Sequence, residues 1–348
     1  KFYTYTNQEI RSLADDHYEL IADYYRITKT GNWENGVNIL HYRQSDEEFI
    51  AKHDISLQDW QAIKSTFAQS CMALRAERLR PGLDDKIISG WNGLMLSGLV
   101  NAANALEGNS ILENAIANAH FIKDKMIIDG KLYRSYKDGK ATIPAFLEDH
   151  ALVAEGMVNL YEATFDEQWL FIAQALVETV MKEFLDPEDN LFYYTSDQGE
   201  QLISRKKEVF DNVIPASNSV MANVLLRLGT LLDKNEYVEQ AHAMVNTLSK
   251  WIAQESRDMS NWALVYASLT KPLAEIAIVG QEANDYGSQL SSRYMPQCIL
   301  TGTTTESQLP LLVDRQAINS DTTIFVCFEK ACRLPVHTVN EALLQLNS

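Results

Sequence analysis

The chain has 348 residues, of which 46% are hydrophobic, so it can bury a sizeable core and global disorder is excluded. Its 47 acidic residues outnumber the 30 basic ones, and the net charge of −17 argues against nucleic acids and anionic membrane surfaces as partners, because both bind through basic contacts. No apolar run approaches the 18 residues of a membrane span, and we expect a cytoplasmic protein. The first residue is Lys1, with neither an initiator Met nor a signal-peptide pattern, which indicates that the chain starts within a longer protein.

Helical periodicity dominates most of the chain. An early segment has apolar residues on one face, and Pro81-Gly82 ends it. That face is formed by Trp60, Ile63, Phe67, Cys71 and Leu74. Three later helices, starting near residues 92, 149 and 218, are apolar on nearly all sides, which is typical of buried helices. Helices with a single apolar stripe alternate with them, and Asp129-Gly130 predicts a hairpin between two of the helices.

This alternation of buried and one-sided helices predicts a mainly α fold with two concentric layers. An (α/α) toroid over residues 1–271 has this arrangement and gathers the loops before its inner helices around one mouth. An ordinary helical solenoid with N-caps at the same positions is the alternative. Residues 272–348 have the strand–helix–strand order of a small α/β unit, without the glycine pattern of a nucleotide site.

Three polar clusters precede the buried helices. In a toroid they converge on the mouth, where paired carboxylates can perform acid–base chemistry and a neighbouring Trp can stack on a sugar. Each cluster has an alternative use as helix caps, ion pairs or core. The candidate catalytic residues are Asp85, Glu148, Asp149 and Asp211, and the candidate substrate-binding residues are Lys86, Trp91, Asn92, His150, Asn218 and Ser219.

The cysteines are too few for a disulfide scaffold. Cys327, Cys332 and His337 could supply three zinc ligands, but no fourth is evident, so we favour a buried Cys327 and an incidental Cys332. We therefore expect no metal and no cofactor.

Several motifs resemble those of the YyaL and spermatogenesis-associated protein family. They are DDKIISGWNGLM at 84–95, FLEDHA at 146–151, LYEAT at 160–164 and PASNSV at 215–220. The chain's opening and its ending, with Cys327 and the segment 332–335, also fit. The resemblance implies an (α/α)6 toroid related to N-acylglucosamine 2-epimerases and six-hairpin glycosidases. It further implies that the chain is a C-terminal portion, with a thioredoxin-like domain and the remaining toroid helices as its partners in the same protein.

Two functions follow as hypotheses. The first is an enzyme acting on a small sugar-like ligand, either an epimerase-like isomerase or a glycosidase. The second is a non-catalytic binding or redox-partner platform for a thioredoxin-like domain. The enzyme hypothesis requires at least two carboxylates facing one concave mouth with an aromatic wall, and it fails if Asp85, Glu148 and Asp211 point outward or into tight caps.

Overall fold

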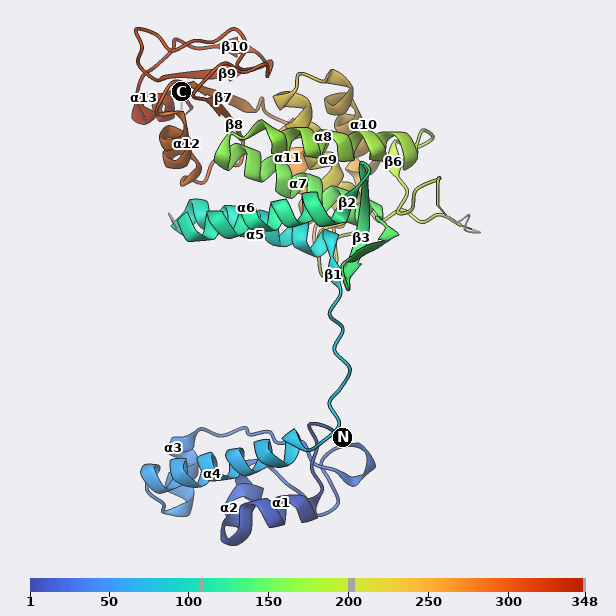
Figure 1. The fold of residues 1–348 in the computed structure, drawn as a ribbon, viewed down its shortest axis with the longest axis vertical. Helices are drawn as coiled ribbons and strands as arrows, with labels where there is room; N and C mark the ends of the chain where they lie inside the picture. Colours follow the sequence, from blue (N-terminus) through green and yellow to red (C-terminus); the bar gives the residue numbers. More distant parts are fainter. Residues whose placement is uncertain (107–108, 200–203, 347–348) are drawn as a thin grey trace. The chain divides into compact units, whose positions relative to one another are not determined.

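The computed structural model describes residues 1–106, 109–199 and 204–346, and its backbone contacts divide the chain into two compact units. These units are Lys1–Asp84 and Asp85–Ser348 (Figure 1). The boundary predicted at residues 271/272 lies inside the second unit, where the C-terminal strands share a core with the helices.

The first unit is a small helical body around an aromatic core. Trp60 is fully buried, and its ring centroid lies 4.3 Å from that of Phe49 and 4.8 Å from that of Tyr24. Asp46 accepts hydrogen bonds from Tyr24 and Trp60 and forms an ion pair with Lys64. The elements are α1 (Asn7–Ala14), η1 (Asp15–His17), α2 (Tyr18–Tyr24), η2 (Glu34–Gly36), α3 (Asp46–His53) and α4 (Leu57–Ala76). The predicted apolar face is on α4: Trp60, Phe67 and Cys71 belong to this core, and the partly buried Ile63 and Leu74 pack against it.

The second unit contains the alternating helices. Three inner helices lie side by side, α5 (Ser89–Leu106), α7 (Leu147–Thr164) and α9 (Ser217–Leu231). Each packs against its own outer helix, namely α6 (Asn109–Phe121), α8 (Glu167–Glu183) and α10 (Asn235–Gln254) (Figure 1). A π-helical turn, η3 (Ile122–Met126), extends α6, and α11 (Ser260–Leu269) packs on α9 and α10. The predicted mainly α class is confirmed, with two helical layers as in part of a toroid.

The burial of α5 differs from the sequence prediction. Helices α7 and α9 are buried on most sides, as their sequences predict. By contrast, Trp91 on α5 is 62% exposed and Met95 is also exposed. Helix α5 packs on α6 and α7, and this leaves one apolar flank facing solvent.

Short strands lie between the helices. The strands β1 (Ile87–Ile88), β2 (Ile127–Ile128), β3 (Lys131–Lys137) and β4 (Lys140–Pro144) form one antiparallel sheet, and β5 (Leu185–Asp186) pairs with β6 (Leu191–Phe192). The predicted hairpin at Asp129-Gly130 is confirmed, and both residues have positive φ. An equivalent turn at Asp138-Gly139, which the sequence analysis did not identify, joins β3 to β4.

The predicted C-terminal α/β element is a four-stranded sheet in the order β10-β9-β7-β8. Strands β7 (Ala274–Val279) and β8 (Cys298–Thr303) are parallel, whereas β9 (Thr323–Phe328) runs antiparallel to both β7 and β10 (Ala331–Cys332). One face packs on α12 (Ala283–Ser291) and α13 (Val339–Leu346). The other face joins the core of the helical layers, because side chains alternate along each strand.

Helices α5 and α7 approach each other very closely at two glycines. A Cβ at Gly93 would lie 2.6 Å from backbone atoms of Leu152 and Val153, and one at Gly156 would lie 2.9 Å from the carbonyl oxygen of Gly93. Backbone atoms cannot rotate away as a side chain can. The helix pair therefore needs glycine at both positions.

Replacing Gly93 by Ala should force the helices apart, and we expect a loss of about 2 kcal/mol or more in unfolding free energy, as for other overpacked core sites. Gly98→Ala on the same helix is the matched control, because no atom lies within 4 Å of its added Cβ. It should stabilise the protein by about 0.5–1 kcal/mol through helix propensity. Urea denaturation measures both, and equal effects would contradict the proposed contact.

Candidate functional site

The start of α7 holds a fully buried carboxylate that connects three elements. Asp149 Oδ1 accepts hydrogen bonds from Ser89 Oγ (3.1 Å) and the Gly90 amide (3.0 Å) at the beginning of α5. Its Oδ2 accepts from the Phe146 amide (3.0 Å) and from Arg134 Nη1 of β3 (2.9 Å). All four donors bind one carboxylate, so Asp149 acts as an anchor that fixes the geometry of this region.

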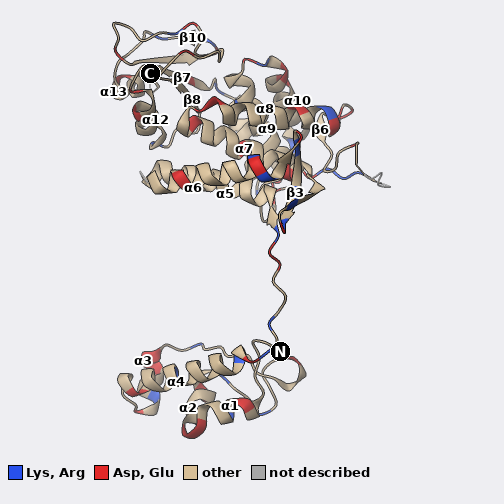
Figure 2. Cartoon of the chain, viewed as in Figure 1, with Lys and Arg blue, Asp and Glu red and all other residues tan. Residues whose placement is uncertain are grey.

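Glu148 lies beside this anchor in a different environment. Its side chain is 12% exposed, and its one ion pair is to Arg134 Nη1 at 3.3 Å. Burial raises the pKa of Glu148 above its usual value despite Arg134, and the charges of Asp149 and Glu208 act in the same direction. Figure 2 shows basic and acidic segments next to each other where β3 meets α7. Glu148 therefore holds a proton to higher pH than an ordinary glutamate.

Tyr194 and Glu208 complete this group. The ring of Tyr194 lies 5.1 Å from that of Phe146. Burial, followed by the charge of Glu148, raises the pKa of Tyr194 to about 12. Glu208 accepts a 3.4 Å hydrogen bond from the Ser217 amide, so its carboxylate lies at the start of α9, although Glu208 itself belongs to the segment before that helix. We name Arg134, Glu148, Asp149, Tyr194 and Glu208 the carboxylate cluster.

The first predicted group makes other contacts. Asp85 is 49% exposed and forms an ion pair with Lys137 at 2.5 Å. Lys86, Trp91 and Asn92 line a shallow, mostly apolar cavity of about 520 Å³, whose described lining contains no carboxylate. The Asn92 amide donates to the Ile88 carbonyl.

The third predicted group is structural in the described residues. Asp211 accepts from the amides of Ala216 (2.9 Å) and Asn261 (2.8 Å), so it caps the starts of α9 and α11. Asn218 is fully buried and exchanges hydrogen bonds with the backbone of Phe192. Ser219 donates to the Ala216 carbonyl and accepts from the Asn261 amide. These contacts use the main hydrogen-bonding capacity of each side chain.

His150 is also buried within the fold. Its Nδ1 donates to the Phe146 carbonyl at 2.9 Å, and its ring packs edge-on against Phe184. Burial lowers the pKa of His150 below its usual value, although Asp149 and Glu183 oppose this effect. These contacts give His150 a packing role and provide no open face for a ligand.

Of the predicted carboxylates, Asp85 is half exposed and Asp211 caps helix starts. Glu148 is buried, and the charge of Glu208 acts on it. The aromatic wall consists of Phe146 and Tyr194. The sequence analysis did not identify Glu208.

The sequence analysis did not identify a second polar surface. A cavity of about 760 Å³ runs along the inner helices and is bounded by residues 291–300. Arg227 of α9 binds both oxygens of Glu162 at 2.5 and 2.6 Å, and Asn223 donates to Glu155 at 3.2 Å. Burial raises the pKa of Glu155 and of Glu162. The sequence signal is the seven-residue spacing of Glu148, Glu155 and Glu162, which places three carboxyl groups along one face of an apolar helix.

The cysteine interpretation needs a correction. Cys327 and Cys332 form a disulfide across β9 and β10. Neither the zinc hypothesis nor an incidental Cys332 predicted this pairing, because the sequence does not show that the two residues face each other across a two-residue turn. Over the described ranges, no group of three or more metal-ligating side chains is found.

Asp149→Asn should remove the acceptor charge that binds Arg134 and leave the buried donors poorly matched. Breaking a buried pair in this way typically costs about 3–5 kcal/mol, and we expect a loss of that size in urea denaturation. Asp85→Asn is the control, and it should leave the midpoint almost unchanged because its ion pair is exposed. An Asp149→Asn midpoint equal to the parent's would show that Asp149 is not an anchor.

His150 should make stability depend on pH. Its folded pKa lies below the unfolded value of about 6.5, so protonation favours unfolding, and stability should fall as the pH drops from about 6.5 toward the folded pKa. His150→Phe should flatten this part of the curve, whereas exposed His242→Gln should not. Thermal unfolding between pH 7.5 and 5 measures the difference, and a parallel decline in all three proteins would refute this assignment.

Comparison with known proteins gives relatives along nearly the whole chain, although the chain matches no established family model. Spermatogenesis-associated protein 20 of Mus musculus and that of Homo sapiens are each 25% identical over 375 aligned positions, which include 96% of this chain. The Rattus norvegicus protein is 26% identical over 348 positions and 91% of this chain. The chain spans about half the length of these curated relatives, between 44% and 48%.

Solved structures show more distant similarity. A sugar epimerase from a ruminal bacterium has 17% identity and a TM-score of 0.40, over 47% of this chain and 44% of that one. A GH76 α-mannanase from Bacteroides thetaiotaomicron has 16% identity and a TM-score of 0.40, over 69% and 71%. An unsaturated glucuronyl hydrolase from Bacillus sp. GL1 has 17% identity and a TM-score of 0.39, over 58% of each chain.

In the part of the chain that the structure describes, no helix combines the length and apolar character of a membrane span. The likeness to the curated relatives confirms the resemblance that the motifs predicted: the chain is similar to spermatogenesis-associated protein 20 over nearly its whole length.

Proposed function

We propose that the second unit performs general acid–base chemistry on a carbohydrate, with Glu148 as the proton donor. The observation that carries this proposal is the contrast between two adjacent carboxyl groups. Asp149 is saturated by four donors, whereas Glu148 has one ion pair and a pKa raised by burial. Adjacent groups with such different environments are typical of sites that separate an acid from an electrostatic or structural anchor.

Glu208 is the second carboxylate of the proposed site. It comes from the segment before α9, and its charge acts on both Glu148 and Tyr194. We assign it the role of base opposite the Glu148 acid. Arg134 orients Glu148, and the rings of Phe146 and Tyr194 offer an apolar face for a sugar ring.

A polyhydroxylated ligand is supported by the chemistry of the inner cavity. Its lining includes side-chain amides and carboxyl groups from all three inner helices, which can exchange hydrogen bonds with hydroxyl groups. The amide side chains are Asn101, Asn104, Asn159 and Asn223. Glu148 lies on the α7 face that also carries Glu155 and Glu162, so one helix connects the proposed acid to this lining.

The test uses the full-length natural protein and a panel of monosaccharides and short oligosaccharides. NMR should detect epimerisation or hydrolysis of one sugar, and Glu148→Gln should reduce the rate by about 10²–10⁴-fold, as expected for loss of a general acid. Exposed Glu188→Gln should retain the parent rate. As the pH rises through the raised pKa of Glu148, the parent rate should fall because the acid loses its proton.

Sugar-dependent thermal shifts distinguish a failed assignment from a failed function. Binding and turnover that survive Glu148→Gln would refute the role of Glu148. No shift and no turnover with any sugar would refute the carbohydrate proposal and favour a non-catalytic platform.

A further inference from the structure

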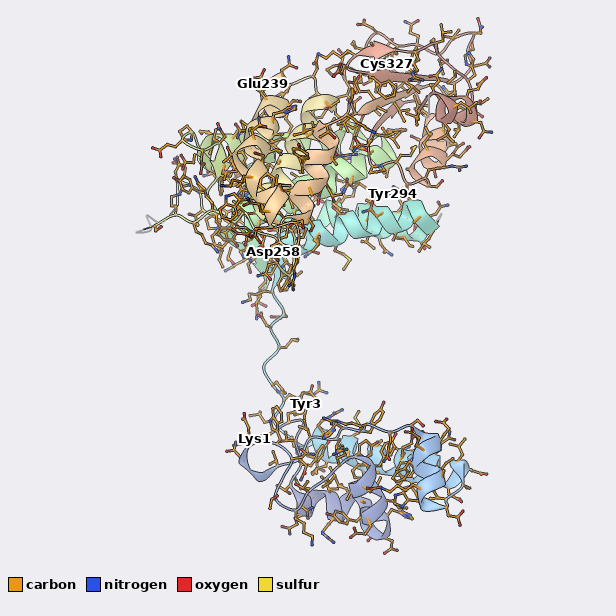
Figure 3. The ribbon with its side chains drawn as sticks, turned by 180° about the vertical axis from the view of Figure 1, so that it is seen from behind. Lys1, Tyr3, Glu239, Asp258, Tyr294 and Cys327 are labelled. Carbon is orange, nitrogen blue, oxygen red and sulfur yellow. A yellow bond between two sulfur atoms is a disulfide. The ribbon has the colours of Figure 1, made fainter. Side chains whose placement is uncertain are left out.

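The C-terminal sheet contains a disulfide in an unusual polar setting, away from the carboxylate cluster. Cys327 of β9 and Cys332 of β10 are directly opposite each other in the antiparallel pair. Cys327 is fully buried, whereas Cys332 is exposed on the edge strand. Figure 3 shows Cys327 on this sheet. One sulfur is therefore on the accessible side of the bridge, and the other is enclosed by the fold.

A guanidinium group contacts both sulfurs. Arg315 Nη2 lies 3.2 Å from Sγ of Cys327 and 3.1 Å from Sγ of Cys332. The Arg315 guanidinium also lies over the ring of Phe325, with its central carbon 5.7 Å from the ring centroid. A cation at this distance interacts only weakly with a neutral disulfide, but it strongly stabilises a thiolate.

A buried carboxyl group lies on the other side of Cys327. Glu275 of β7 is the direct cross-strand partner of Cys327, so the two side chains share one face of the sheet. Glu275 is only 6% exposed, and its Oε2 has no hydrogen-bond partner in the described residues. Burial raises the pKa of Glu275, and the charge of Asp233 raises it further. The hydrogen bond from the Lys330 amide and the charges of Arg315 and Lys330 lower this pKa. A carboxyl group with one unpartnered oxygen beside a sulfur is suited to exchange a proton with it.

The turn between the cysteines has a left-handed backbone conformation at both of its central residues. Glu329 and Lys330 both have positive φ, at 50° and 66°, although neither is glycine. The Lys330 ammonium binds Asp233, in the turn after α9, at 2.5 Å. Opening the disulfide would loosen a turn that also supplies the amide donor of Glu275.

We propose that Cys327 and Cys332 form a redox-active pair that exchanges with a dithiol, with Arg315 and Glu275 as positioning residues. A thiolate of the dithiol attacks Cys332 and forms a mixed disulfide, while the original S–S bond breaks and its electron pair leaves on Cys327. Arg315 stabilises this thiolate, and Glu275 gives it a proton and then regains one from water. The second thiol of the reductant then attacks the mixed disulfide and releases Cys332, which takes a proton from water. The dithiol loses two electrons, and the protein gains two electrons and two protons.

The experiment measures thiols in the full-length natural protein and in its variants. Free cysteines are alkylated with a mass tag after incubation with dithiothreitol or with glutathione buffers of graded ratio, and peptide mapping locates each tag. Within this chain, Cys71 and Cys298 are free in the oxidised state, so its thiol count should rise from two to four. We expect the transition to fall within the glutathione range, as it does for exchange-active pairs.

The variants separate a redox role from a structural one. Arg315→Met should slow reduction by dithiothreitol by about tenfold, the change expected when a leaving thiol's pKa rises by one to two units, and Arg315→Lys should recover part of the rate. Glu275→Gln should flatten the pH dependence of the reduction rate. Arg333→Lys on the same hairpin, where Arg333 lies over Phe328, is the control and should match the parent.

Two outcomes would overturn the proposal. The first is a pair that stays oxidised across the whole glutathione range, which is the behaviour of a structural disulfide. The second is reduction of the Arg315→Met and Glu275→Gln variants at the parent rate and with the parent pH profile. The readout is thiol chemistry, so it is independent of any activity on sugars.

Discussion

The close approach of α5 and α7 is the constraint on which the rest of the second unit depends. Gly93 and Gly156 let the two backbones meet without intervening side chains. At the same end of the pair, Gly90 leaves room for the Asp149 carboxylate, because a Cβ there would lie 2.9 Å from its Oδ1. The packing of the helices and the hydrogen bonds of Asp149 are therefore parts of one arrangement, and each requires a small residue on α5.

This arrangement explains how two neighbouring acids acquire different properties. The close contact puts Asp149 within reach of the first amides of α5, and the hairpin that precedes α7 brings Arg134 to its other oxygen. Glu148, one residue earlier, shares Arg134 with Asp149 at a longer distance and is buried with less compensation. Burial without full pairing favours the protonated form of a carboxyl group. Asp149 takes most of the nearby donors, and this leaves Glu148 in an environment that suits the proposed acid.

In the C-terminal sheet, packing also encloses one functional group and leaves its neighbour exposed. Its inner face belongs to the core of the helical layers, so Glu275 and Cys327 are enclosed although they lie near the edge of the sheet. The edge strand β10 stays exposed and carries Cys332. The fold thereby places an accessible sulfur, a buried sulfur, a cation and a carboxyl group within one hairpin and its neighbours.

The amino-acid sequence by itself determined the local structure and the similarity to known relatives. Apolar spacing predicted the helices, Asp129-Gly130 predicted its hairpin, and the motifs around residues 84–95, 146–151 and 215–220 predicted the relatives. Only the tertiary structure decided which polar residues meet. Asp85, Asp211 and Glu148 are all acidic residues near the start of an inner helix, so the sequence could not separate a helix cap from the proposed acid. Glu208, Arg315 and the Cys327–Cys332 bridge depend on contacts between elements distant in sequence or on the facing of paired strands. Such contacts are set by packing, which leaves no periodic pattern along the chain.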